Sequence, residues 1–129
     1  MTPLPIRLSP GSDLRRALHA ALSPDRAGFV VAGIGSLSVA RLRFAGKKQP
    51  AELVGDLEIL TLSGSLSPDG PHLHMSVSDA DGRVFGGHVA DGCVVRTTAE
   101  VLLVRLPGWA FARGVDAATG YAELVVSVL

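Results

Sequence analysis

The sequence predicts an α+β fold, in which a mostly antiparallel sheet of about seven or eight strands carries one main helix near the N-terminus. Two observations lead to this prediction. Only one stretch has apolar residues at helical spacing, whereas many stretches have β patterns bounded by Gly, Pro and Asp. The length of 129 residues, without repeats or low-complexity tracts, indicates a single domain over residues 1–129.

The chain is expected to open with a short strand and the helix. Residues 5–9 form the strand, and Pro10-Gly11 breaks it. Ser12 or Asp13 can cap a helix by accepting a backbone N–H. An apolar stripe at helical spacing follows, formed by Leu14, Ala17, Leu18, Ala21 and Leu22. Pro24 is expected to end this helix.

The rest of the chain is expected to be strands and turns. Besides a hairpin at residues 71–88, strands are predicted at residues 27–34, 37–44, 53–65, 94–106 and 121–128. The G-I-G-S segment between the first two is too short for a phosphate loop, because no helical pattern follows it. Trp109 and Phe111 are expected in a loop, where they would pack against a neighbouring subunit.

The hairpin is the most informative stretch, because its alternation fixes a register. Strict alternation places two sets on opposite faces: His72, His74, Ser76 and Ser78, against Leu73, Met75 and Val77. A three-residue loop at residues 80–82, ended by a glycine at positive φ, keeps the apolar residues together. This register places His88 opposite His74.

Three of the four histidines therefore converge on one face. Neutral imidazoles at His72, His74 and His88 suit zinc or another divalent metal, and three ligands leave a fourth position open. Gly86 and Gly87 would keep the site uncrowded for a bound ligand or cofactor. A small-molecule or anionic ligand is an alternative occupant, bound by protonated histidine and glycine N–H groups. The simplest alternative is ordinary histidines on a solvated sheet face.

Two carboxylates within predicted strands, Glu58 and Glu100, are the candidates for a catalytic acid or base. Each lies among apolar residues, where a carboxylate needs a partner. The alternative for both is a salt bridge at a rim or an interface.

The composition limits location and partners. Charged residues make up only 19% and hydrophobic residues 47%, which favours burial of surface in an oligomer. No apolar run reaches the length of a membrane span, and no secretory leader is recognised. The single cysteine, Cys93, suits a reducing cytoplasm and a buried structural role. Net charge is zero, so the basic group Arg41, Arg43, Lys47 and Lys48 is interpreted as a solvated edge and loop.

The segments GIGSLSVARLR, DLEILTLSGS, HLHMSVSDADGRVFGGH and TAEVLL, in this order, resemble the plant-and-prokaryote-conserved (PPC) domain. The resemblance covers nearly the whole chain and implies a homotrimer built from an antiparallel sheet with a helix. It also implies DNA binding in a regulatory role. The fold is similar to that of acetolactate decarboxylase, whose metal is held by histidines, and this likeness also points to His72, His74 and His88.

The AT-hook core Arg-Gly-Arg-Pro, which reads the minor groove in the plant proteins of this family, is absent from the sequence. The leading hypothesis is a trimeric PPC module with a metal or ligand site and a DNA-associated role. A metal-dependent enzyme of decarboxylase or hydrolase type and a purely structural oligomerisation module are the alternatives.

Overall fold

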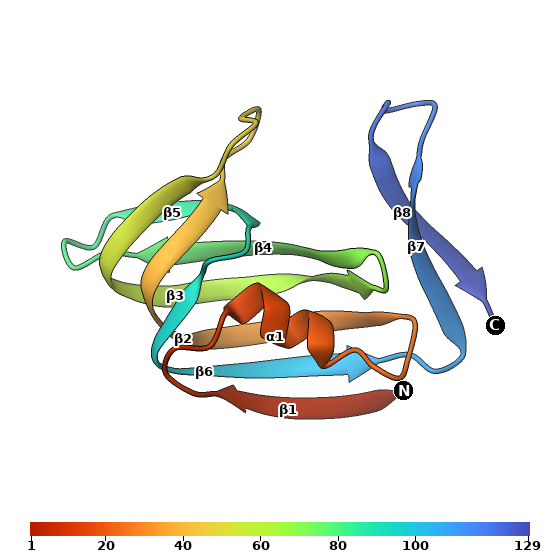
Figure 1. Cartoon of the computed structure of the whole chain (residues 1–129), viewed down its shortest axis with the longest axis horizontal. Coiled ribbons are helices and arrows are strands. Elements are labelled where there is room, and N and C mark those ends of the chain that lie inside the picture. Colours follow the sequence, from red (N-terminus) through yellow and green to blue (C-terminus); the bar gives the residue numbers. More distant parts are fainter.

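A curled antiparallel sheet with one helix packed against it forms the body of the molecule, and a separate hairpin follows at the C-terminus (Figure 1). The computed structural model describes all residues, 1–129. The elements in chain order are β1 (Thr2–Leu8), α1 (Leu14–Ala20), β2 (Gly28–Arg43), β3 (Ala51–Ser67), β4 (Gly70–Ser78), β5 (Val84–Val89), β6 (Val94–Arg105), β7 (Trp109–Val115) and β8 (Ala122–Val128). Eight strands and one helix confirm the predicted α+β class.

The six-stranded sheet curls until two of its non-adjacent strands meet. Its order is β1-β6-β2-β3-β4-β5, and every pairing is antiparallel. The last residues of the long β2 leave their usual neighbours and pair with the edge strand β5, through Leu42 with Val89 and Arg43 with His88. This closure covers an edge that would otherwise expose unpaired backbone groups.

The helix α1 fills the concave side of the sheet with its apolar stripe. Leu14, Leu18 and Leu22 are fully or almost fully buried, although the regular helix ends at Ala20, before Leu22. Asp13 caps the helix, because its carboxylate accepts from the backbone N–H of Arg16 at 3.1 Å. No helix of the structure has the length and apolar character to cross a membrane.

The prediction of two strands separated by G-I-G-S was wrong, because residues 28–43 form one strand. The glycines allow neighbouring strands to approach closely. A Cβ on Gly33 would lie 2.9 Å from the side chain of Leu62. A Cβ on Gly35, where φ is +150°, would collide with the carbonyl oxygen of Thr98. Irregular register beside Gly35 then lets the strand bend without ending.

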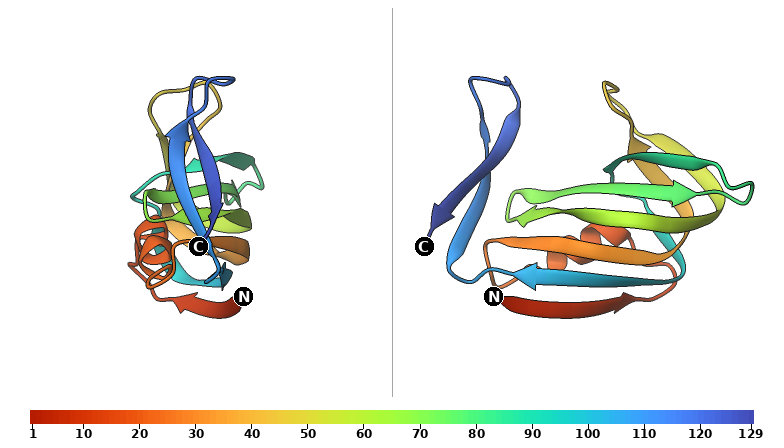
Figure 2. Two further views of the ribbon diagram at one scale, coloured as in Figure 1. Left: turned by 90° about the vertical axis from the view of Figure 1, so that its right-hand side faces the viewer. Right: turned by 180° about the vertical axis from the view of Figure 1, so that it is seen from behind.

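The prediction of a loop at Trp109 and Phe111 was also wrong, since both belong to β7. β7 and β8 form a two-stranded sheet that stands beside the main body (Figure 2). Phe111 is buried and meets Phe29 of β2 edge to face, with ring centroids 5.5 Å apart. Trp109 stays exposed, and so do several valines of β8.

Candidate metal centre

The β4–β5 hairpin adopts the predicted register. His74 pairs with His88, and Ser78 pairs with Val84 at the turn. Asp79 holds the turn together, because its carboxylate accepts from the backbone N–H groups of Asp81 and Arg83 at 3.0 and 2.9 Å. Leu73, Met75 and Val77 are buried on the inner face, which explains why no other register is adopted.

The outer face of this hairpin brings His72, His74 and His88 into one cluster. Ring centroids lie 4.5 Å apart for His74 and His88, 5.1 Å for His72 and His74, and 5.4 Å for His72 and His88. One ligand nitrogen can be chosen on each ring such that all three lie within 4.8 Å of one another. His72 and His74 are exposed and His88 is half-buried, so the cluster is open to solvent.

This arrangement fits a divalent metal such as zinc. Ligand nitrogens at 2.0–2.1 Å from one tetrahedral zinc lie about 3.4 Å apart, so the three rings would turn toward one another on binding. Partial burial, Arg113 and the neighbouring histidines lower the pKa of His72. Partial burial, Arg43 and His74 lower the pKa of His88. A lowered pKa keeps both imidazoles neutral at pH 7, which is the form that binds metals.

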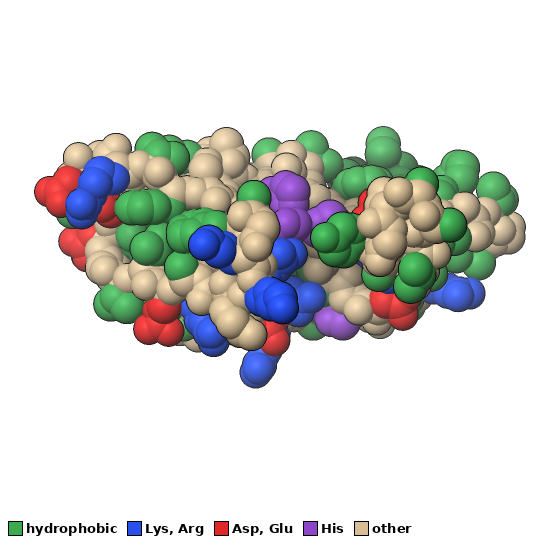
Figure 3. Space-filling view, turned by 90° about the horizontal axis from the view of Figure 1, so that it is seen from above, with side chains coloured by type: hydrophobic (Ala, Val, Ile, Leu, Met, Phe, Trp, Pro, Cys, Tyr) green, Lys and Arg blue, Asp and Glu red, His purple; other side chains and the backbone are tan.

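Basic side chains border the cluster on one side, as Figure 3 shows for the surface where the histidines and several Lys and Arg side chains lie together. A hollow of about 540 Å³ there is lined by His72 and His88 together with Arg15, Arg41 and Arg43. From the sequence alone, Arg41 and Arg43 are expected on a solvated edge. No local pattern links Arg15 with them, because this residue comes from α1.

The C-terminal hairpin borders the cluster on the other side. Arg113 of β7 donates to the Ser65 hydroxyl at 2.9 Å, and its backbone N–H donates to the Asp69 carboxylate at 2.8 Å. These bonds place Glu123 of β8 beside a hollow of about 330 Å³ that His72 and His74 also line. Sequence reasoning missed Arg113 and Glu123, because no local pattern shows that a hairpin some 40 residues later returns to this face.

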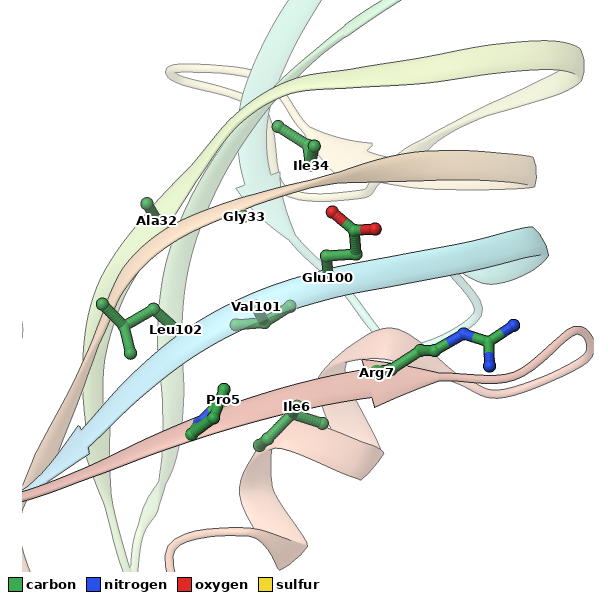
Figure 4. A pocket seen from close by; sticks show the side chains of 9 residues that line it. All are labelled: Pro5, Ile6, Arg7, Ala32, Gly33, Ile34, Glu100, Val101 and Leu102. Carbon is green, nitrogen blue, oxygen red and sulfur yellow. The ribbon is translucent and has the colours of Figure 1, made fainter.

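The other predicted site residues lie outside the three-histidine cluster. Glu58 is exposed and pairs with Ser78, four residues along β4 from His74. Glu100 lies on the opposite side of β2, in an apolar groove with Arg7 and Ile34 (Figure 4). No carboxylate belongs to the cluster of ligand atoms.

Gly86 and Gly87 differ in their surroundings. A Cβ on Gly87 would lie 2.7 Å from the carbonyl oxygen of Arg43, so this glycine permits the approach of β2 to β5. A Cβ on Gly86 would meet nothing closer than 3.4 Å. Backbone packing therefore requires glycine at Gly87, whereas the surface at Gly86 has room for a side chain.

Known proteins share both the sequence and the fold. The chain is 51% identical over 122 residues to the "Bifunctional protein GlmU" of Synechococcus sp. (strain JA-3-3Ab), covering 93% of this chain and 20% of that protein. The chain thus spans about a fifth of the length of the curated relatives it matches. A hypothetical protein from Salmonella cholerae-suis (Salmonella enterica) has a TM-score of 0.94 at 39% identity, covering 98% of this chain and 94% of that one.

A metal-containing protein from Archaeoglobus fulgidus has a TM-score of 0.81 at 28% identity, covering 97% of this chain and 94% of that one. The model of the Plants and Prokaryotes Conserved (PCC) domain matches residues 1–107, which include every strand of the main sheet and all three clustered histidines. The chain therefore belongs to the PCC family, the PPC domain that its sequence resembles.

Proposed function

We propose that this chain is a metal-binding PPC module that holds a divalent ion, zinc, through His72, His74 and His88. The observation that carries the proposal is the convergence of three imidazoles from two paired strands, with ligand nitrogens within 4.8 Å. The three rings lie within 5.4 Å of one another, centroid to centroid, so they can face one common ion. Bound zinc would retain an open position for water and lower its pKa to about 7.

The similarity to a metal-containing protein at 28% identity and 97% coverage supports the same proposal. The lowered pKa values of His72 and His88 support it independently, because metal binding then displaces few protons at pH 7.

The test is the metal content of the purified protein. Elemental analysis after dialysis should find one zinc per chain, and His74→Ala and His88→Ala should each lose most of it. The matched control is His19→Ala, which removes the one histidine outside the cluster, on the exposed side of α1. Equal metal in wild type and His74→Ala, with folding intact, would overturn the proposal.

The proposed assembly is a homotrimer. Two exposed apolar surfaces support association, namely the groove that includes Ile34 and Leu102 and the β7–β8 hairpin with Val126 and Val128. Light scattering at micromolar concentration should give three times the chain mass. The monomer mass at that concentration would refute the trimer.

Association with DNA is the second candidate function. A group of basic side chains favours it. Arg41 and Arg43 lie at the end of β2, and the loop that follows carries Lys47 and Lys48. Arg43 donates to the Lys47 carbonyl at 3.2 Å, which holds this loop against the strand. Binding through these charges should weaken steeply with salt, as counterions are released. A gel shift on mixed-sequence duplex at low salt, repeated with Arg43→Gln, tests it, and absence of any complex excludes it.

A further inference from the structure

The basic hollow beside the histidines has the charge and shape of an anion site. Three guanidinium groups, from Arg15, Arg41 and Arg43, line it against a single carboxylate, Asp91. They come from α1 and from the end of β2, so the closure of the sheet brings them together. Its volume of about 540 Å³ lies within the range of small-molecule pockets.

The three arginines differ in the hydrogen bonds and ion pairs that they already make within the chain. Arg15 pairs with Asp91 at 3.1 Å and also donates to the Pro71 carbonyl, so its position is fixed. Arg43 donates one nitrogen to the Lys47 carbonyl at 3.2 Å. The Arg43 guanidinium keeps further donors for a ligand.

Arg41 has a buried donor that makes no hydrogen bond within the chain. Its Nε is buried and has no hydrogen-bond acceptor. The Glu52 carboxylate forms an ion pair with this Nε at 3.9 Å, a distance too long for a hydrogen bond. Most buried donors in folded proteins are hydrogen-bonded, so an oxyanion beside this Nε would supply the hydrogen bond that Glu52 is too distant to form.

The anion site adjoins the proposed metal site. Arg43 pairs directly with His88 across the β2–β5 closure, and both His72 and His88 line the hollow. A ligand held by the arginines would therefore have its other end within reach of an ion on the histidines.

We propose that this hollow binds a small oxyanion ligand, whose carboxylate or phosphate pairs with Arg41 and Arg43 while a second oxygen reaches the metal. The inference rests on the proposed metal-binding function and names its ligand class. Planar guanidinium groups bind carboxylate and phosphate through paired hydrogen bonds, and a concave site suits a small molecule better than a duplex.

The experiment is calorimetric titration of the metal-loaded protein with succinate and with inorganic phosphate. Arg43→Gln and Arg41→Gln should each weaken binding of at least one probe by about tenfold or more, the usual effect of losing a hydrogen bond to a charged group. Arg43→Lys should bind the probes more tightly than Arg43→Gln but more weakly than wild type, because lysine keeps the positive charge without the paired donors of a guanidinium. The control is Arg26→Gln, an exposed arginine that lies outside the lining of the hollow.

A second readout separates this inference from the metal proposal. In protein loaded with Co²⁺, succinate should change the visible spectrum, and Arg43→Gln should require about tenfold more succinate for the same change. If elemental analysis finds no metal on the histidines, and phosphate still binds in a way that depends on Arg43, the metal proposal fails and the anion site is retained. Metal bound by the histidines with no binding of either probe at millimolar concentration would overturn the anion site. Arginine-dependent binding of duplex DNA alone would overturn it too.

Discussion

Arg43 lies directly opposite His88, where the end of β2 turns from the sheet to pair with β5. This pairing joins the two halves of the candidate site, because His88 belongs to the histidine cluster and Arg43 to the basic hollow. It also closes the curl of the sheet, since β2 already pairs with β3 and β6 along most of its length. The geometry of the site therefore depends on how closely two backbones approach at one point.

That approach gives the first prediction, on Gly87→Ala. The added methyl would lie 2.7 Å from the carbonyl oxygen of Arg43, so the strands must separate. We expect a loss of about 1–3 kcal/mol in unfolding free energy, together with weaker metal binding. Urea denaturation and metal analysis measure the two effects.

Gly86→Ala is the matched control for Gly87→Ala, because its methyl would meet nothing nearer than 3.4 Å. Its unfolding free energy should stay within about 0.5 kcal/mol of wild type. Equal unfolding free energies for the two alanine variants would show that the β2–β5 contact does not limit stability.

The second prediction concerns Asp13, which holds two backbone groups at once. One carboxylate oxygen accepts from Arg16 N at the helix start, and the other accepts from Gly92 N at 2.7 Å, across the chain. Asp13→Ala should cost about 1–3 kcal/mol, more than a simple helix cap, because a second donor loses its acceptor. Asp13→Asn keeps one acceptor oxygen and should cost less in the same denaturation experiment.

The parts of the fold that depend on local patterns could be predicted from the sequence. The hairpin register follows from alternation over residues 72–78 and from the Asp79 turn, and the structure confirms it. The apolar stripe on α1 likewise follows from the spacing of residues close together in sequence. The continuous β2 was not predictable in this way, because glycines such as Gly35 look like a break in sequence and are explained only by a strand that packs closely against them.

The histidines of the candidate site could be predicted from local pattern, but the residues around them could not. Two histidines on one strand and a third opposite them are fixed by a single hairpin. Arg15, Arg43 and Glu123 reach the same face through a helix, a sheet closure and a second hairpin, contacts between residues far apart in sequence. No period or spacing in the chain encodes such contacts, so they appear only in three dimensions.

The third prediction is an alkaline loss of stability caused by Cys93. Burial raises the pKa of this thiol from 9.0 to about 11. Between these values the unfolded chain releases a proton that the folded chain keeps, so stability falls as pH rises from about 9 to about 11. The contribution is at most about 3 kcal/mol. Denaturation at several pH values should show a shallower decline for Cys93→Ala than for wild type.

The same burial makes the thiol unreactive in the folded protein. At pH 8, a thiol reagent should label Cys93 only after denaturant is added, since the reactive form is the thiolate. Rapid labelling of the native protein would contradict a buried Cys93.

The last prediction identifies which carboxylate acts near a bound metal. Glu123 shares a hollow with His72 and His74, whereas Glu58 lies four residues along the strand and Glu100 lies in a different groove. A carboxylate beside a metal-bound water stabilises the protonated water and raises its pKa. In protein loaded with Co²⁺, the pH at which the visible spectrum changes should therefore fall in Glu123→Gln. Glu58→Gln and Glu100→Gln should titrate as wild type. A shift in Glu100→Gln with none in Glu123→Gln would assign the carboxylate to a contact between subunits, because within one chain Glu100 lies away from the histidines.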